Sequence, residues 1–318
     1  MTHTQITYLA FGIVLFLAIL LDLGLLSKKS KELTIKQALY QTLFWVMLGL
    51  GFGGFVWYEE GRATGLEYIS AYLMEWSLSI DNIFVFVLIF SFFKVKEAYI
   101  PRALLIGIIL AIVFRVIFIT VGVELVERFH WMLYLFGAFL IYTGFKMFTS
   151  NQEEEFDPAQ SSVYLFLKKY LPVTLEDGEG RYRKVVNGKP VYTALFVVVV
   201  MLATTDIVFA LDSIPAVMGI SRNVLVIYTS NIFAVLGLRS LFFLLRGAVS
   251  KFDYLQQGIA IVLVFIGIKM LGEHLIATAV DKSSQVLISL VVIIGCISGS
   301  ILYSIYHQKK GVPKDLEE

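Results

Sequence analysis

This chain of 318 residues has few of the residues that build disulfides, thiolate metal sites and histidine-ligated cofactor sites. Its single cysteine, Cys296, excludes a disulfide or a thiolate metal site within one chain. Its four histidines fall at the ends of apolar segments or in loops, which argues against a di-iron or haem membrane oxidase. The chain also lacks a recognisable set of nucleophile and general base, so we expect that it is not an enzyme.

Charged residues are scarce as well. They make up 16% of the chain, and the net charge of +1 gives no indication of a nucleic-acid partner. Hydrophobic residues make up 58%, and the mean hydropathy is +0.79, far from the balance of a soluble domain. The length allows about nine spans of roughly 20 residues each. We therefore predict an all-α polytopic membrane protein whose main partner is the lipid bilayer.

The apolar segments predict nine membrane spans. No basic segment precedes the first of them and no small-residue cleavage signal follows it, so we interpret it as a span rather than a signal peptide. The loops on one side hold 19 Lys and Arg residues and those on the other side hold 4. This asymmetry predicts an N-terminus outside and a C-terminus in the cytoplasm. The predicted spans are 6–26, 39–57, 66–93, 102–123, 131–149, 193–217, 224–245, 256–272 and 284–306.

The spans divide the chain into five predicted parts. The third part, a cytoplasmic loop, contains an amphipathic stretch, VYLFLKKYL, and a hairpin turn predicted at Asn187–Gly188. We expect any protein partner to dock on this loop. The five parts are two N-terminal spans (1–65), a first three-span repeat (66–149), the cytoplasmic loop (150–192), a second, inverted three-span repeat (193–272), and a C-terminal span with a cytoplasmic tail (273–318).

An internal repeat supports this division. Because each copy holds three spans, an odd number, the second copy enters the membrane from the opposite side. Inverted repeats are typical of secondary transporters, in which the ion site lies near the bilayer midplane between the repeats. A duplicated membrane scaffold without transport is the alternative. The matched segments are 111–119 with 235–243, which aligns Arg115 with Arg239, and 136–147 with 259–270.

The same acidic pattern occurs in both repeats, as EWSLSIDN at 75–82 and as DIVFALDS at 206–213. An ionised carboxylate at the centre of a spanning helix costs about 2.5 to 3.5 kcal/mol, so four of them require compensation. A cation is the favoured source, and oxygen ligands suit Mg²⁺, Ca²⁺ or Mn²⁺. We therefore predict a midplane metal site shared by the two repeats. Its candidate ligands are Glu75, Asp81, Asn82, Asp206, Asp212 and Ser213.

The geometry of a straight helix separates these carboxylates. Asp81 and Asp212 each lie about 120° around the helix from the first carboxylate of their pattern, Glu75 or Asp206. All four carboxylates would converge more easily if the helices unwound locally. Pro215 predicts such unwinding in the second copy, because it cannot donate a backbone hydrogen bond.

Four further charged residues lie in or near the spans. Asp22 and Glu67 are weaker additional acidic candidates, close to the expected membrane surfaces. Arg115 and Arg239 are expected to balance charge rather than to bind a substrate. The alternatives to a direct ion or proton role for the carboxylates are a structural ion pair between one of these arginines and an aspartate, or capping within a broken helix. Asn82 and Ser213 could likewise cap such a break.

Four segments of the chain stand out as specific motifs: SLSIDNIFVF (77–86), TTDIVFALDSIPAV (204–217), TSNIFAVLGLR (229–239) and GIKM (267–270). They resemble the TerC family, especially its Alx-type members, and the resemblance extends over nearly the whole chain. It implies a polytopic protein of the bacterial inner membrane with a LysE-like transporter architecture, linked to manganese export and tellurite resistance. One position departs from the family pattern: members commonly carry Glu three residues before the aspartate that matches Asp206, where this chain has Ala203.

Residues and resemblance together lead to a functional expectation. We expect the chain to export Mn²⁺ from the cytoplasm, driven by protons, with Mg²⁺ or Ca²⁺ as alternative ions and no organic cofactor. The alternative is a non-transporting membrane scaffold or metal sensor linked to tellurite and metal resistance.

Overall fold

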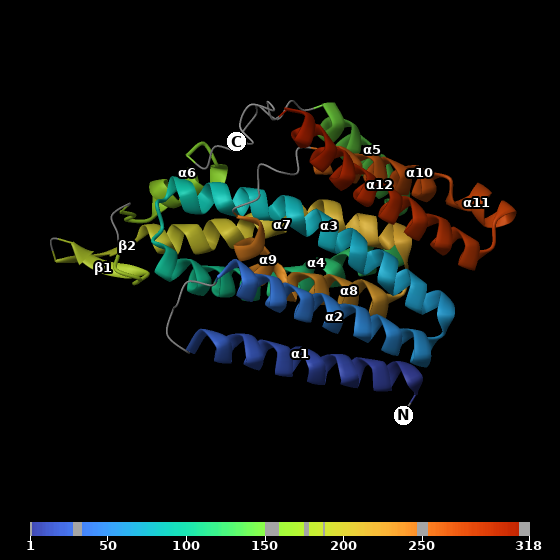
Figure 1. Ribbon diagram of the computed structural model, residues 1–318, viewed down its shortest axis with the longest axis horizontal. Helices are drawn as coiled ribbons and strands as arrows, with labels where there is room; N and C mark the ends of the chain where they lie inside the picture. The colour runs from blue at the N-terminus through green and yellow to red at the C-terminus, as the bar shows by residue number, and fades with distance from the viewer. Residues whose placement is uncertain are drawn as a thin grey trace, which may run out of the picture.

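The computed structural model is a mostly helical bundle (Figure 1), and it describes residues 2–27, 34–149, 159–174, 178–186, 188–246 and 254–311. Helices occupy the ranges in which spans are predicted. These helices are α1 (His3–Ser27), α2 (Ile35–Glu60), α3 (Arg62–Phe92), α4 (Ile100–Arg128), α5 (Met132–Thr149), α7 (Ala194–Ile220), α8 (Val224–Leu236), α9 (Leu238–Leu245), α10 (Leu255–Leu271) and α12 (Lys282–Gly311). The shorter elements are a 3₁₀ turn (Glu97–Tyr99), α6 (Ser162–Tyr170), β1 (Arg183–Val186), β2 (Lys189–Tyr192) and α11 (Glu273–Ala279).

Five helices of the described chain are long and apolar enough to cross a membrane: α1, α2, α4, α7 and α12. A sixth crossing results if α8 and α9, which meet at a 43° bend, form one broken span. A crossing needs about 20 apolar residues. The apolar segments of α5 and α10 are shorter than that, and α3 carries the buried carboxylates Glu67 and Glu75. Nine crossings therefore stay a prediction.

The unwinding predicted at Pro215 is wrong, because α7 continues as an α-helix through this residue to Ile220. Pro215 removes only its own backbone donor, and α7 packs against α3, α4, α5 and α10 along its length. Packing of this kind lets membrane helices tolerate an internal proline. The break occurs instead at Gly237, between α8 and α9.

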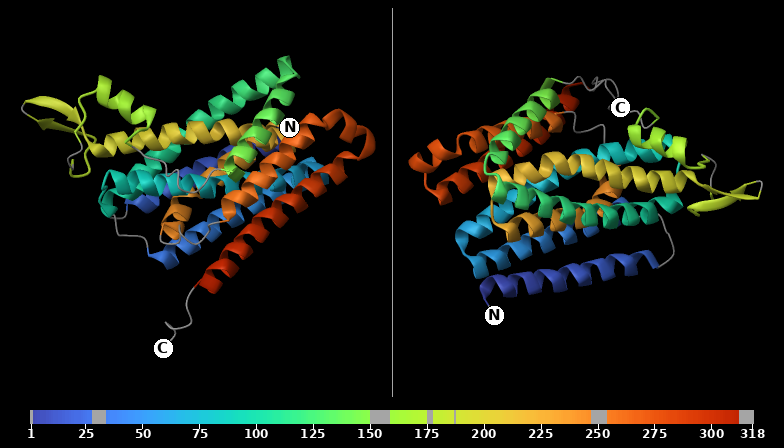
Figure 2. Two further views of the ribbon diagram at one scale, coloured as in Figure 1. Left: turned by 90° about the horizontal axis from the view of Figure 1, so that it is seen from above. Right: turned by 180° about the vertical axis from the view of Figure 1, so that it is seen from behind.

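The centre of the bundle consists of α3, α4, α7 and α8, with α1 and α2 along one edge and α5, α10 and α12 along the other (Figures 1 and 2). The packing crosses between the two predicted repeats. Helix α4 of the first packs against α7 of the second, and α8 of the second packs against α3 of the first. The central helices therefore bring residues of both repeats together.

Helices α5 and α10 approach each other closely through small residues. A Cβ atom added to Gly267 would lie 2.6 Å from the carbonyl oxygen of Gly137, and one added to Gly144 would lie 2.8 Å from that of Ala260. Small residues allow this close approach of membrane helices. The sequence repeat aligns Gly144 with Gly267 and Gly137 with Ala260. The contact of Gly267 with Gly137 therefore corresponds to the contact of Gly144 with Ala260 when the aligned segments, 136–147 and 259–270, are exchanged.

Helix α6 and a hairpin form a small unit at one end of the bundle, beside the start of α7 (Figure 2). Strands β1 and β2 pair antiparallel, and Gly188 in their turn has a φ of +76°. Asn187, the other residue of the predicted turn, lies outside the described residues. Helix α6 buries Tyr164 and Leu167, and the ring of Tyr164 packs edge-on against Phe93.

Candidate functional site

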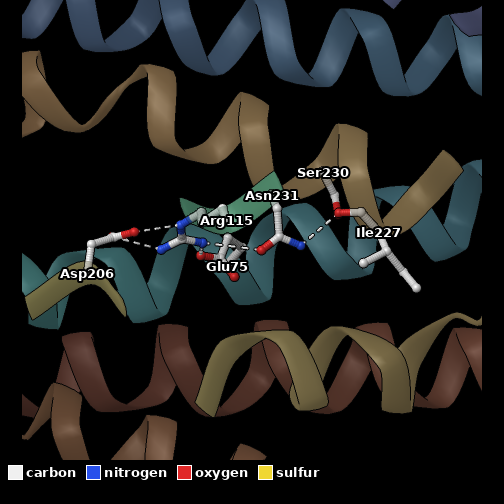
Figure 3. A network of polar contacts seen from close by, with 6 residues as sticks. All are labelled: Glu75, Arg115, Asp206, Ile227, Ser230 and Asn231. Carbon is white, nitrogen blue, oxygen red and sulfur yellow. Dashed lines mark hydrogen bonds and ion pairs between the residues drawn. The ribbon is translucent and has the colours of Figure 1, made fainter. Parts of the chain in front are cut away.

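The guanidinium of Arg115, on α4, is completely buried and lies between two carboxylates (Figure 3). Its Nε and Nη2 donate to the two oxygens of Asp206 on α7, both at 3.0 Å. Its Nη1 donates to Glu75 on α3, and also to Oδ1 of Asn231 on α8 at 3.2 Å. The Asn231 amide in turn donates to the carbonyl of Ile227 at 2.8 Å, which fixes its oxygen toward the arginine. Four helices thus meet at one cation.

The cluster holds more negative than positive charge. Glu75 and Asp206 contribute two formal negative charges and Arg115 contributes one positive charge. The Oε2 atom of Glu75 is buried and has no hydrogen-bond partner among the described residues. A buried carboxylate charge without compensation is costly. The cluster can therefore accept additional positive charge, either as a proton or as a metal ion.

Other oxygen atoms of α3 and α7 are also available. Ser79, one turn after Glu75, and Ser213, two turns after Asp206, are buried, and their hydroxyls lack hydrogen-bond partners within the described chain. Asn82, farther along α3, is buried as well. Carboxylate, hydroxyl and amide oxygens are ligands for hard divalent cations.

The same cluster fits a metal ion only in part. Arg115 engages three of the four carboxylate oxygens of Glu75 and Asp206. In the part of the chain that the structure describes, no group of three or more Asp, Glu, His or Cys residues is placed to hold a metal ion. The oxygen donors suit such an ion, but an arginine occupies the space between the two central carboxylates.

The second aspartate of the repeated acidic pattern is Asp81 in the first copy and Asp212 in the second. Asp212 is half-buried and accepts a hydrogen bond from the Thr143 hydroxyl of α5 at 3.3 Å. It lies on a different face of α7 from Asp206, as the helical geometry predicts. The side chain of Asp81 lies outside the described residues. The structure thus joins the first carboxylates of the two patterns and places Asp212 beside α5.

The two additional acidic candidates have buried partners. Asp22 of α1 pairs with Arg239 of α9, and both side chains are buried. Glu67, near the start of α3, is buried and accepts a hydrogen bond from the hydroxyl of Ser221, which follows α7. Arg115 and Arg239 therefore both face carboxylates, the arrangement that charge balance requires.

Ala203, at the position where the family pattern has Glu, is only 3% exposed. Its methyl group therefore faces neighbouring helices and not the outer surface of the bundle. It lies three residues before Asp206 on α7, on an adjacent part of the same helix surface.

Comparison with known proteins identifies the chain. Residues 60–311 match the family described as integral membrane protein TerC family. The chain belongs to the TerC family. No solved structure matches the chain. The resemblance noted in the sequence is thereby confirmed, and the protein is an integral membrane protein with several apolar helices.

Three relatives of this TerC-family protein illustrate the similarity. The membrane protein STKORF319 of Myxococcus xanthus is 40% identical over 98% of this chain and 94% of its own length. A membrane protein of Rickettsia bellii (strain RML369-C) is 40% identical over 90% of this chain and 95% of its own length. Alx of Escherichia coli (strain K12), whose name proposes that it is a membrane-bound redox modulator, is 38% identical over 84% of this chain and 86% of its own length.

Sequence reasoning missed two contributors to the site of this TerC-family protein. Asn231 orients Arg115, and Thr143 is the hydroxyl partner of Asp212. A signal for Asn231 was present, because an amide side chain inside an apolar span needs a polar partner. No comparable signal marked Thr143, since a threonine hydroxyl can bond to a carbonyl of its own helix.

Proposed function

We propose that this protein exports Mn²⁺ from the cytoplasm across the bacterial inner membrane, in exchange for protons. The observation that carries this proposal is the excess negative charge of the buried Arg115 cluster. Glu75 and Asp206 occupy matched positions of the two acidic patterns, and one oxygen of Glu75 has no partner among the described residues. A hard divalent cation is the cargo that such oxygen atoms favour.

The packing of the helices supports an inverted repeat, as the proposal requires. Two close contacts between α5 and α10 are equivalent under the alignment of the repeats. They join Gly144 to Ala260 and Gly267 to Gly137. Helix α4 packs against α7 in the same way that α8 packs against α3. We propose that the two repeats rock against each other around the Arg115 cluster and open it to each side of the membrane in turn.

Proton coupling follows from the chemistry of the ligands. Carboxylates that hold a divalent cation must be ionised, so buried carboxylates can exchange a metal ion for protons. The excess of Lys and Arg in the loops on one side supports an N-terminus outside and a C-terminus in the cytoplasm.

One observation favours the alternative, a non-transporting scaffold or metal sensor. Arg115 and Asp206 form the bidentate geometry of a structural ion pair. The Escherichia coli relative is named for a proposed role in redox modulation, which does not require transport. In this alternative the loop 150–192 is the surface on which a protein partner docks.

Flux in liposomes separates the two functions. Purified protein is reconstituted with a Mn²⁺-sensitive dye inside the vesicles, and a pH gradient is imposed across the membrane. We expect Mn²⁺ movement that reverses direction with the gradient and is lost in Asp206→Asn and Asp212→Asn. Folded, inserted protein that binds Mn²⁺ without moving it favours the sensor, and protein that neither binds nor moves Mn²⁺ contradicts the metal role.

A further inference from the structure

The predicted metal ligands already hold a cation that belongs to the protein. Arg115 donates to both oxygens of Asp206 at 3.0 Å and to one oxygen of Glu75. A divalent ion bound by both carboxylates needs the same oxygen atoms. It also cannot lie beside the guanidinium without strong repulsion in a buried site, where screening is weak. The two cations therefore cannot occupy the site together in this arrangement.

The remaining contact of Arg115 is neutral. Asn231 accepts from Nη1 at 3.2 Å, and its own amide is held by the carbonyl of Ile227. An amide oxygen stabilises a guanidinium less strongly than a carboxylate does. Asn231 can thus hold the arginine head at the edge of the site without competing for the positive charge. The structure contains both a primary anchor for Arg115, Asp206, and a weaker secondary one.

The repeat-related arginine is kept away from this site. Arg239 aligns with Arg115 in the sequence repeat, yet it pairs with Asp22 of α1, a helix outside both repeats. If Arg239 also faced Glu75 and Asp206, two guanidinium groups would neutralise the two carboxylates completely. Its pairing with Asp22 leaves the central cluster with one arginine and a net negative charge. The asymmetry between the two arginines gives Arg115 a role that Arg239 does not share.

We propose that Arg115 is the resident counter-cation of the site, and that a divalent ion binds by displacing its guanidinium from Asp206 toward Asn231. This inference rests on the proposed function and names the residue that determines how tightly the cargo is held. Arg115 compensates one of the two carboxylate charges while no metal is bound, and its return expels the ion. Removal of its charge strengthens Mn²⁺ binding and slows release of the ion.

Equilibrium binding of Mn²⁺ to purified protein in detergent tests the proposal without measuring transport. We expect Arg115→Gln to bind Mn²⁺ roughly 5- to 150-fold more tightly than the unmodified protein, the range of a typical coupling between two ligands. The matched control is Arg246→Gln, which removes the same charge from an arginine paired with Glu97 outside the cluster. We expect this control to bind Mn²⁺ as the unmodified protein does.

A chemical competition distinguishes a counter-cation from a merely structural arginine. In Arg115→Ala, millimolar free guanidinium should occupy the vacated position and weaken Mn²⁺ binding in proportion to its concentration. The unmodified protein should show no such competition, because its own guanidinium fills the position. If Arg115→Gln and Arg115→Ala do not fold, Arg115→Lys decides. Its ammonium cannot hold both Asp206 oxygens, and we expect severalfold tighter Mn²⁺ binding.

The outcomes separate this proposal from the proposed function. Tighter binding in Arg115→Gln, including binding that appears only in this variant, supports a resident counter-cation. Equal or weaker Mn²⁺ binding in folded Arg115→Gln, with measurable binding in the unmodified protein, overturns the counter-cation while the metal site stands. Absence of Mn²⁺ binding from both proteins overturns the metal site itself.

Discussion

Arg115 and Asp206 face each other as a bidentate ion pair, with Nε and Nη2 of the arginine each 3.0 Å from one carboxylate oxygen. They come from α4 and α7, 91 residues apart in the chain, and both side chains are buried. The planar fork of a guanidinium matches the two oxygens of a carboxylate, a geometry that lysine cannot reproduce. The pair thus connects one helix of each predicted repeat at the centre of the bundle.

Replacement of Asp206 by Asn should destabilise the protein strongly. Breaking one partner of a buried ion pair typically costs about 3 to 5 kcal/mol, because the other charge stays buried. The free energy of unfolding in detergent measures this loss. Asp212→Asn is the matched control, since Asp212 is half-buried and has a hydroxyl partner at 3.3 Å. We expect a loss of about 1 kcal/mol there. Similar losses in the two variants would contradict the ion pair.

Apolar runs in the sequence predict where the helices lie. No such run predicts the break between α8 and α9. The chain has 24 glycines, many within spans, so Gly237 alone does not predict a break. Gly237 lies close against α2, where an added Cβ atom would be 3.3 Å from the Trp45 side chain, and the sequence does not display that contact. At Pro215 the sequence predicts a break that the structure does not have. A proline that breaks an isolated helix is accommodated in the packed α7.

The site was predictable in its residue types but not in its pairings. Glu75, Asp206 and Arg115 stand out because each is a charge within an apolar segment. Which carboxylate each arginine meets depends on how the helices pack. The partner of Arg239 is Asp22, 217 residues earlier, in a helix that has no counterpart in the repeat. Local spacing contains no information about a contact of that kind.

The pair of Asp22 and Arg239 should connect α1 to the rest of the bundle. Asp22→Asn and Arg239→Gln should each lower the free energy of unfolding, and the double variant should lose less than the sum of the two. For residues in contact, such an interaction energy is about 0.5 to 3 kcal/mol. Equilibrium unfolding of the four proteins of this double-mutant cycle measures it. Additive effects would mean that the two side chains do not interact in solution.

Gly267→Ala should destabilise the contact between α5 and α10. The added methyl would lie 2.6 Å from the Gly137 carbonyl oxygen, a backbone atom that moves only with its helix. Overpacking of this kind costs about 1 to 3 kcal/mol. Gly295→Ala is the control, because a Cβ there would have no atom of the described residues within 4 Å apart from its own helix backbone. Alanine's better helix propensity should make that change neutral or stabilising by up to about 1 kcal/mol. Thermal unfolding of the two variants gives the comparison.

Labelling of single cysteines tests the proposed orientation. In a Cys296→Ala background, Val185→Cys places a thiol on the exposed hairpin and Arg128→Cys places one at the exposed end of α4. The Lys and Arg distribution predicts that the hairpin is cytoplasmic and the end of α4 is outside. A membrane-impermeant maleimide should therefore label only Arg128→Cys in intact cells, and both variants after permeabilisation. Labelling of Val185→Cys in intact cells would contradict the orientation and the inverted repeat.

Ala203→Glu should strengthen Mn²⁺ binding if the Arg115 cluster is the metal site. Position 203 is buried and lies three residues before Asp206, so a carboxylate there can reach an ion beside Asp206. Each added carboxylate raises the affinity of a hard divalent cation as long as the site tolerates the extra repulsion when it is empty. It would also give Arg115 a second partner on α7, which would oppose the gain.

Ala203→Gln separates charge from volume in this experiment. Both replacements insert a long side chain into a packed position, which costs about 1 to 3 kcal/mol of stability in either variant. Only the glutamate adds a ligand charge, so calorimetric titration should show tighter Mn²⁺ binding in Ala203→Glu than in both Ala203→Gln and the unmodified protein. If folded Ala203→Glu binds no more tightly than Ala203→Gln, the side chain at position 203 does not reach the ion, and the metal site does not extend from Asp206 toward the start of α7.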